Sequence, residues 1–233
     1  MAREQFIDNL RFASRMLPPP QVRSDLGHSA DEYLSSTLRT ADLWLTPKSL
    51  EGFDRADFAD LPKKELDELA GSVKAFLEIA QQVPANKPAT KTQSKQARKH
   101  LERVISIVGP HLLREWIGAQ QEMVKQATAA AKARGWYVER DEKEVLESLL
   151  GTYKAPRLRI RTPNKEVVID PIARFGSGSQ GVVDLVVMPT YETVYLVAFK
   201  DGHWNIVSPR GKPRTRPFNQ STLLTSIARL PRP

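Results

Sequence analysis

The chain has 233 residues, a formal net charge of +8 and no cysteine. This length suits one large domain or two small ones. The lack of cysteine excludes disulfide scaffolds, thiolate zinc sites and cysteine nucleophiles, and it fits a reducing, cytoplasmic location. No apolar run approaches the length that spans a bilayer, so we expect no transmembrane association.

Residues 1–28 are predicted to form a terminal arm. Phe6, Leu10 and Leu17 have near-helical spacing and precede a run of three prolines. This pattern fits a short amphipathic helix that the prolines end.

Residues 29–135 have the pattern of a helical region. Ser29 begins a capping box, which predicts that a helix starts at residue 30. We expect the apolar stretch around Trp44 to pack on the helical core, because large aromatic side chains are more often buried than exposed. Pro62 is placed to open the next helix, whose apolar stripe runs from Leu66 to Ala80.

A longer helical stretch begins near residue 93. Its first part has one apolar face, formed by Ala97, Leu101, Val104, Ile105 and Val108. The pair Gly109-Pro110 predicts a kink or short turn, because proline removes a backbone hydrogen-bond donor. The second part runs on to Arg134, where Gly135 is suited to cap the helix end.

Residues 136–207 are predicted to form a β-sheet module. We expect a short first strand at Tyr137, a short helix over residues 141–150, and then an antiparallel meander of strands separated by turn residues. The strand over residues 182–188 is apolar on both faces, which predicts a central strand covered at least partly on both sides.

Residues 208–233 are predicted to be a basic tail rich in proline and arginine, with a last short helix capped by Asn219 or Ser221. Together these patterns predict an α+β fold. A helical N-terminal region precedes a small antiparallel β-sheet module with one or two covering helices.

Basic residues are concentrated in two parts of the chain. Residues 87–134 hold ten bases and three acids, and residues 209–233 hold six bases and no acid. Spacings of three and four residues place several of the bases on one helix face, where they could meet phosphates. The predicted contact residues are Lys87, Lys91, Lys95, Arg98, Lys99 and Arg103 on the helix, and Arg210, Lys212, Arg214 and Arg216 in the tail.

This distribution favours a non-enzymatic, nucleic-acid-associated protein whose partner is DNA or RNA. The alternative is a protein-interaction or assembly subunit that binds acidic protein surfaces. The charge pattern alone does not separate the two. Neither needs a cofactor, and the four histidines have no metal-ligand spacing, so the sequence predicts no metal site.

A second alternative rests on Asp184 within one predicted strand and Lys200 at the end of the next. This arrangement resembles the core of PD-(D/E)XK nucleases, which implies Mg²⁺-dependent cleavage, with Glu144 or Glu147 on the preceding helix as a further acid. The resemblance covers about 20 residues, and the family pattern needs an acid two residues before the lysine. That position is Ala198, so we predict no cleavage of DNA or RNA.

Overall fold

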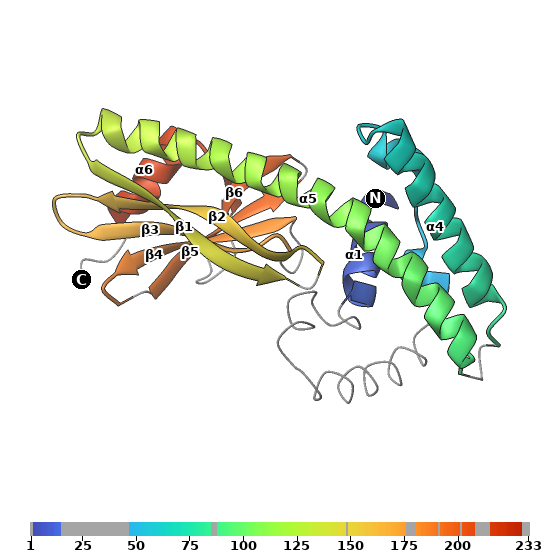
Figure 1. Cartoon of the computed structure of the whole chain (residues 1–233). Coiled ribbons are helices and arrows are strands. Elements are labelled where there is room, and N and C mark those ends of the chain that lie inside the picture. The colour runs from blue at the N-terminus through green and yellow to red at the C-terminus, as the bar shows by residue number, and fades with distance from the viewer. Residues whose placement is uncertain are drawn as a thin grey trace. The chain divides into compact units, whose positions relative to one another are not determined.

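A computed structural model describes residues 2–14, 47–84, 88–147, 149–175, 180–190, 192–200, 202–207 and 215–229 (Figure 1). The sequence features at Leu17, Ser29 and Trp44 lie outside these residues. The chain forms two compact units. Unit 1 comprises Met1–Leu113 and Glu147–Gly151, and unit 2 comprises Arg114–Leu146 and Thr152–Pro233.

Unit 1 is helical. It contains α1 (Ala2–Ser14), the 3₁₀ helices η1 (Pro47–Leu50) and η2 (Arg55–Phe58), α4 (Lys63–Gln81) and the first part of α5 (Lys91–Ala133). The predicted opening of α4 is confirmed, since Pro62 lies at its N-cap. Each of these elements contributes buried apolar side chains to the core of the unit, among them Phe6, Leu50, Phe58, Phe76 and Val104.

Of the kink or short turn predicted at Gly109-Pro110, the short turn is wrong, because α5 continues as one helix through Pro110. Proline removes one hydrogen bond from the helix. The neighbouring Val108 and Leu112 are fully buried, and their packing offsets that loss. Gly109 has its own reason to be glycine, since a Cβ there would lie 2.9 Å from the carbonyl oxygen of Leu149.

Unit 2 contains one antiparallel sheet of seven strands in the order β1-β2-β3-β4-β5-β6-β7. The α+β prediction is therefore confirmed. The strands are β1 (Tyr137–Glu147), β2 (Gly151–Arg161), β3 (Glu166–Ala173), β4 (Gly181–Met188), β5 (Glu192–Lys200), β6 (His203–Val207) and β7 (Thr215–Pro217).

The predicted central position of the strand over residues 182–188 is also confirmed. This strand is β4, which pairs with β3 on one side and with β5 on the other. Val183, Leu185 and Val187 are buried on one face, and on the other face Val186 is buried while Asp184 is half-buried.

The second part of α5 lies along the sheet of unit 2, as Figure 1 shows. Trp116 fixes it there: the side chain is 1% exposed, and its Nε1 donates to the Tyr153 hydroxyl at 3.1 Å. A Cβ on Gly181 would come within 2.1 Å of the Trp116 ring, so only glycine fits beneath the indole. Trp204 on β6 also contacts Trp116, with the ring centroids 5.5 Å apart.

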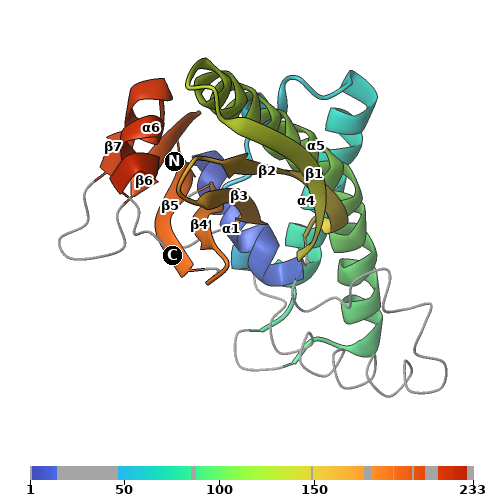
Figure 2. The same cartoon turned by 90° about the vertical axis from the view of Figure 1, so that its left-hand side faces the viewer.

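The last helix, α6 (Gln220–Arg229), lies beside β6 and β7 (Figure 2). Of the two predicted capping residues, Asn219 takes the role, because its Oδ1 accepts from the backbone N of Thr222 at 2.9 Å. Leu223 and Ile227 bury the apolar face of the helix.

The helix predicted over residues 141–150 is wrong. Residues 141–147 belong to β1, one of the two edge strands of the described sheet, and Leu146 is 60% exposed. Glutamate, lysine and leucine favour helices locally, but pairing with β2 and ion pairs to its arginines override that preference.

None of the helices in the described part of the chain combines the length and the apolar character needed to cross a membrane.

Candidate polyanion interface

The predicted basic helix begins with a reciprocal cap. Thr90 Oγ1 accepts from the backbone N of Gln93 at 3.2 Å, and Gln93 Oε1 accepts from the backbone N of Thr90 at 3.0 Å. This arrangement is a capping box, and it satisfies two backbone donors at the start of α5. The cap defines the start of the helix just before its first lysine, Lys91.

Four cations follow at strict four-residue intervals: Lys91, Lys95, Lys99 and Arg103. Residues four apart are neighbours on a helix surface, so these side chains form one row along α5. All four are exposed. The opposite face of α5 is buried through Ala97, Leu101 and Val104, so the row lies on the solvent side of unit 1.

The fourth member of the row is bound by an acid from α4. Arg103 Nε donates to Glu68 Oε1 at 2.7 Å, and its Nη2 donates to Glu68 Oε2. These hydrogen bonds hold the pKa of the Glu68 carboxyl below its usual value, so Glu68 is ionised at neutral pH. Arg98, beside the row, donates to Glu102 at 3.0 Å.

The first three members are different. Lys91, Lys95 and Lys99, called the lysine row below, form no ion pair with any residue that the structure describes. Each lysine has a like charge four residues away, and the first turn of α5 contains no acid. Both features oppose helix stability, because like charges repel at this spacing and the helix N-terminus is already positive.

Of the other predicted contact residues, only Arg216 lies in the part of the chain that the structure describes. Lys87, Arg210, Lys212 and Arg214 lie outside the described residues. Arg216 is on β7, where it donates to Ser226 Oγ at 3.2 Å and its guanidinium carbon lies 5.9 Å from the centroid of the Tyr195 ring. The structure thus gives Arg216 contacts with α6 and β5.

His111 is buried in unit 1. Its Nε2 lies 3.3 Å from Arg3 Nη2, and its Nδ1 lies 3.7 Å from Asp60 Oδ2. The ring also packs on Phe58, with centroids 5.8 Å apart. The imidazole therefore connects α1 and η2 to the core of unit 1.

The structure does not bring the proposed nuclease residues together along the sheet. Asp184 is opposite Leu196 on β5, whereas Lys200 is opposite His203 at the end of that strand. Leu196 and Lys200 are four positions apart on the strand, which is about 13 Å between their Cα atoms. Ala198, where the family pattern needs an acid, is opposite Val182.

Glu144 and Glu147 were predicted on a helix, and both are instead on β1. Glu144 is exposed, and Glu147 is half-buried at the strand end. Because β2 and β3 lie between β1 and β4 in the sheet, two strands separate these acids from Asp184.

An ion pair close to Asp184, with a buried acid, was not predicted from the sequence. Asp170 on β3 is the register partner of Asp184, and its side chain is 1% exposed. Lys143 Nζ on β1 lies 2.6 Å from Asp170 Oδ2. An acid inside an otherwise apolar strand was a signal that it needed a partner, because buried charges are paired. Lys143 could not be predicted as the partner of Asp170, since it lay in a predicted helix.

Three arginines of β2 form a second row of cations, Arg157, Arg159 and Arg161, called the arginine row below. Alternate strand residues share a face, so this row points to one side of the sheet. Arg157 donates to Asp141 at 2.8 and 2.5 Å, Arg159 lies 3.3 Å from Glu166, and Arg161 donates to Glu166 at 3.0 Å.

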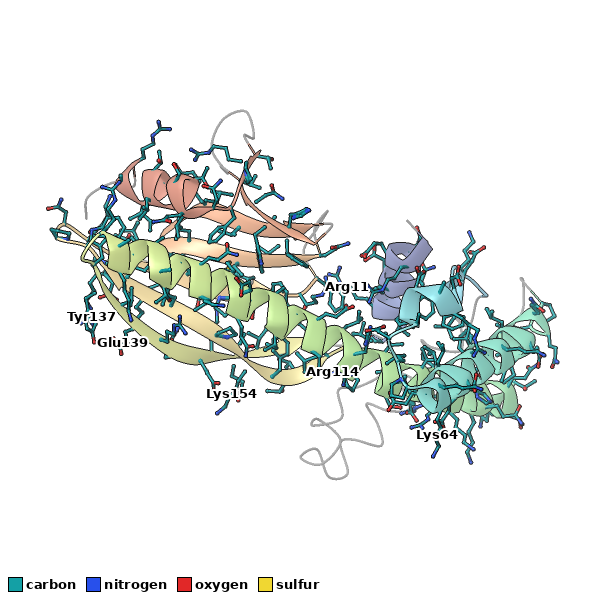
Figure 3. All side chains as sticks on the ribbon, turned by 90° about the horizontal axis from the view of Figure 1, so that it is seen from above. Arg11, Lys64, Arg114, Tyr137, Glu139 and Lys154 are labelled. Atoms are coloured by element: carbon teal, nitrogen blue, oxygen red, sulfur yellow. The ribbon has the colours of Figure 1, made fainter. Side chains whose placement is uncertain are left out.

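The ion pairs of the arginine row shift the pKa values of two of the groups that form them. The hydrogen bonds from Arg157 lower the pKa of the Asp141 carboxyl, and the bond to Glu166 raises the pKa of Arg161. Tyr137 and Glu139, labelled on β1 in Figure 3, extend the set: the Arg161 guanidinium lies 5.4 Å from the Tyr137 ring centroid and 3.5 Å from Glu139. Every member of the arginine row has an acidic partner.

No protein-family model, no curated protein and no solved structure matches this chain.

Proposed function

We propose that the protein is a non-enzymatic, nucleic-acid-associated protein of the cytoplasm that contacts a phosphate backbone through the lysine row of α5. The observation that carries the proposal is the exposure of Lys91, Lys95 and Lys99 at four-residue spacing without an acidic partner among the described residues. DNA and RNA backbones both present the charge that such a row would bind.

The lysine row destabilises its own helix, which supports a role in binding a ligand and not in stabilising the fold. Like charges at four-residue spacing cost a few tenths of a kcal/mol per pair, and a cation near a helix N-terminus costs a similar amount. The capping box at Thr90 secures the helix start despite these charges. A ligand that neutralises the row would remove the repulsion, so binding and helix stability would support each other.

The geometry predicts how the row would bind. Successive members rise by about 6 Å along the helix axis, because each residue adds about 1.5 Å. Lysine is a flexible point charge and does not form the bidentate contacts by which arginine reads guanine. Binding should therefore be independent of base sequence and sensitive to salt, because each phosphate contact releases about one counterion.

The test is a salt titration of binding to random-sequence duplex and single strands. The variant carries Lys91→Gln, Lys95→Gln and Lys99→Gln. The matched control carries Lys125→Gln, Lys132→Gln and Arg134→Gln, which removes the same charge from exposed positions in unit 2. On duplex, the slope of log affinity against log salt should fall by about 0.9 for each lost contact in the variant, and it should stay near the wild-type value in the control.

Two results would contradict the proposal. One is a wild-type protein that binds neither strand type at low salt, and the other is a lysine-row variant whose titration coincides with that of the wild type. Salt-insensitive binding to a single protein would then support the assembly-subunit alternative.

We also expect no nuclease activity. Lys200 is displaced along β5 from the register partner of Asp184, and Asp170, the acid opposite Asp184, is buried against Lys143. Plasmid incubated with the protein and Mg²⁺ or Mn²⁺ should remain intact. Reproducible cutting that is lost in Asp184→Ala or Lys200→Ala would show that the sheet carries this chemistry.

A further inference from the structure

The lysine row continues into Arg103, but the fourth cation has a different environment from the first three. Glu68 on α4 binds its guanidinium through two nitrogens, and the third nitrogen, Nη1, lies 3.4 Å from Ser106 Oγ. All three nitrogens of the guanidinium are therefore engaged within unit 1. Because Glu68 occupies the Nε–Nη2 edge and neutralises the charge, a phosphate that approached Arg103 would have to compete with this carboxylate.

The ion pair between Glu68 and Arg103 is weak enough for a phosphate to compete with Glu68 for the guanidinium. The side chains are 46% exposed for Arg103 and 39% for Glu68, so water screens the pair. Exposed ion pairs range from negligible to modest in strength. The bidentate geometry places this pair toward the stronger end, because the planar guanidinium matches the carboxylate.

This inference rests on the proposed function. We propose that Glu68 ends the phosphate-binding row by holding Arg103 in the ion pair between α4 and α5. The wild-type protein then uses the three cations of the lysine row, and removal of the Glu68 carboxylate adds Arg103 as a fourth. Glu68 thereby sets both the affinity and the salt dependence of binding.

A purely structural role for the pair predicts something different. If the ion pair only fastened α4 to α5, Glu68→Gln would lower the stability slightly and leave binding unchanged. If Arg103 already contacted phosphate in the wild-type protein, Arg103→Gln would weaken binding. The two single variants together with the double variant separate these cases.

The experiment compares wild type, Glu68→Gln, Arg103→Gln and the double variant in salt titrations on random-sequence duplex. Glu68→Gln should bind more tightly at low salt, with a slope steeper by about 0.9. Arg103→Gln and the double variant should both keep the wild-type slope. The control is Glu78→Gln on the same helix, an exposed acid 3.8 Å from Lys74, which makes the same change in net charge without freeing an arginine.

The outcomes also separate this inference from the function on which it rests. An unchanged slope in Glu68→Gln, or equal steepening in Glu78→Gln, overturns the role of Glu68 while the lysine row still binds. A slope lowered by about 0.9 in Arg103→Gln shows that Arg103 is already in contact, and this result holds even if Glu68→Gln does not fold. No effect of the lysine-row variant contradicts the function itself.

Discussion

The lysine row of α5 and the arginine row of β2 contain three cations each, but the two rows differ in whether acidic side chains neutralise them. Each arginine has an acidic partner, with Asp141 and Glu166 as the main ones. The lysines have no ion-pair partner among the described residues. Arg157 and Arg159 are half-buried and Arg161 is exposed, whereas all three members of the lysine row are exposed.

This difference shows that a count of basic residues does not identify a polyanion surface. A cation that is already neutralised by a fixed carboxylate offers little to a phosphate, because binding would first have to break the existing pair. Rows of equal formal charge can therefore serve stability in one place and binding in another. Substitutions in the two rows should accordingly change different measured quantities.

The largest expected effect concerns the ion pair between Lys143 and Asp170. Lys143→Ala removes the cation that lies 2.6 Å from the fully buried Asp170 carboxylate and should lower the free energy of unfolding by about 3 kcal/mol. Lys154→Ala is the matched control, since Lys154 on β2 is 70% exposed and 3.8 Å from Glu142. The control should change stability by less than about 0.5 kcal/mol in urea unfolding. Equal losses in both variants would contradict the importance of the buried pair.

A smaller effect is expected within the arginine row. Arg157→Gln should lower the free energy of unfolding by about 1 kcal/mol at pH 7, because Asp141 loses the nearer of its two arginine partners. The pKa of Asp141 is lowered in the folded protein, so its contribution is complete above the unfolded value of about 3.9 and disappears as the pH falls through the folded value.

The difference between wild type and Arg157→Gln should therefore be constant above about pH 5 and shrink below about pH 4. Asp141→Asn should reproduce it, and the double variant should add little to either single one. A difference that persists unchanged in strong acid would mean that Arg157 acts through packing and not through the ion pair.

The smallest expected effect is on the stability of the lysine row itself. Replacing Lys91, Lys95 and Lys99 by glutamine should leave the free energy of unfolding unchanged or raise it by up to about 0.5 kcal/mol at low salt, because repulsion is relieved. The gain should vanish at high salt. The control should show a small loss instead, since Lys132 and Arg134 lie at the helix C-terminus, where cations are favourable, and Lys125 lies 3.7 Å from Glu122. A clear loss in the lysine row would indicate a structural role.

Some of this protein could be predicted from local patterns in the sequence. The turn residues between β-branched runs gave the strands β3 to β6, and the apolar stripe gave α4. The apolar faces of residues 182–188 also predicted the central position of β4. These features are local, because turn chemistry and hydrophobic periodicity act over a few residues.

Other features were decided only by the tertiary structure. β1 is a strand because β2 provides its hydrogen bonds and ion pairs, although its own residues favour a helix. α5 passes through Pro110 because both flanking turns are packed in the core. A short stretch of sequence does not show whether the local preference or the tertiary packing prevails at β1 or at Pro110, since the stabilising contacts come from distant residues.

The sequence by itself determined where the basic residues are and how they repeat along α5. Only the tertiary structure decided which of them are neutralised. Glu68 lies 35 positions before Arg103, and Asp170 lies 27 positions after Lys143. Charges at such separations meet only when their elements pack, so spacing within one helix could reveal the row but not where it ends.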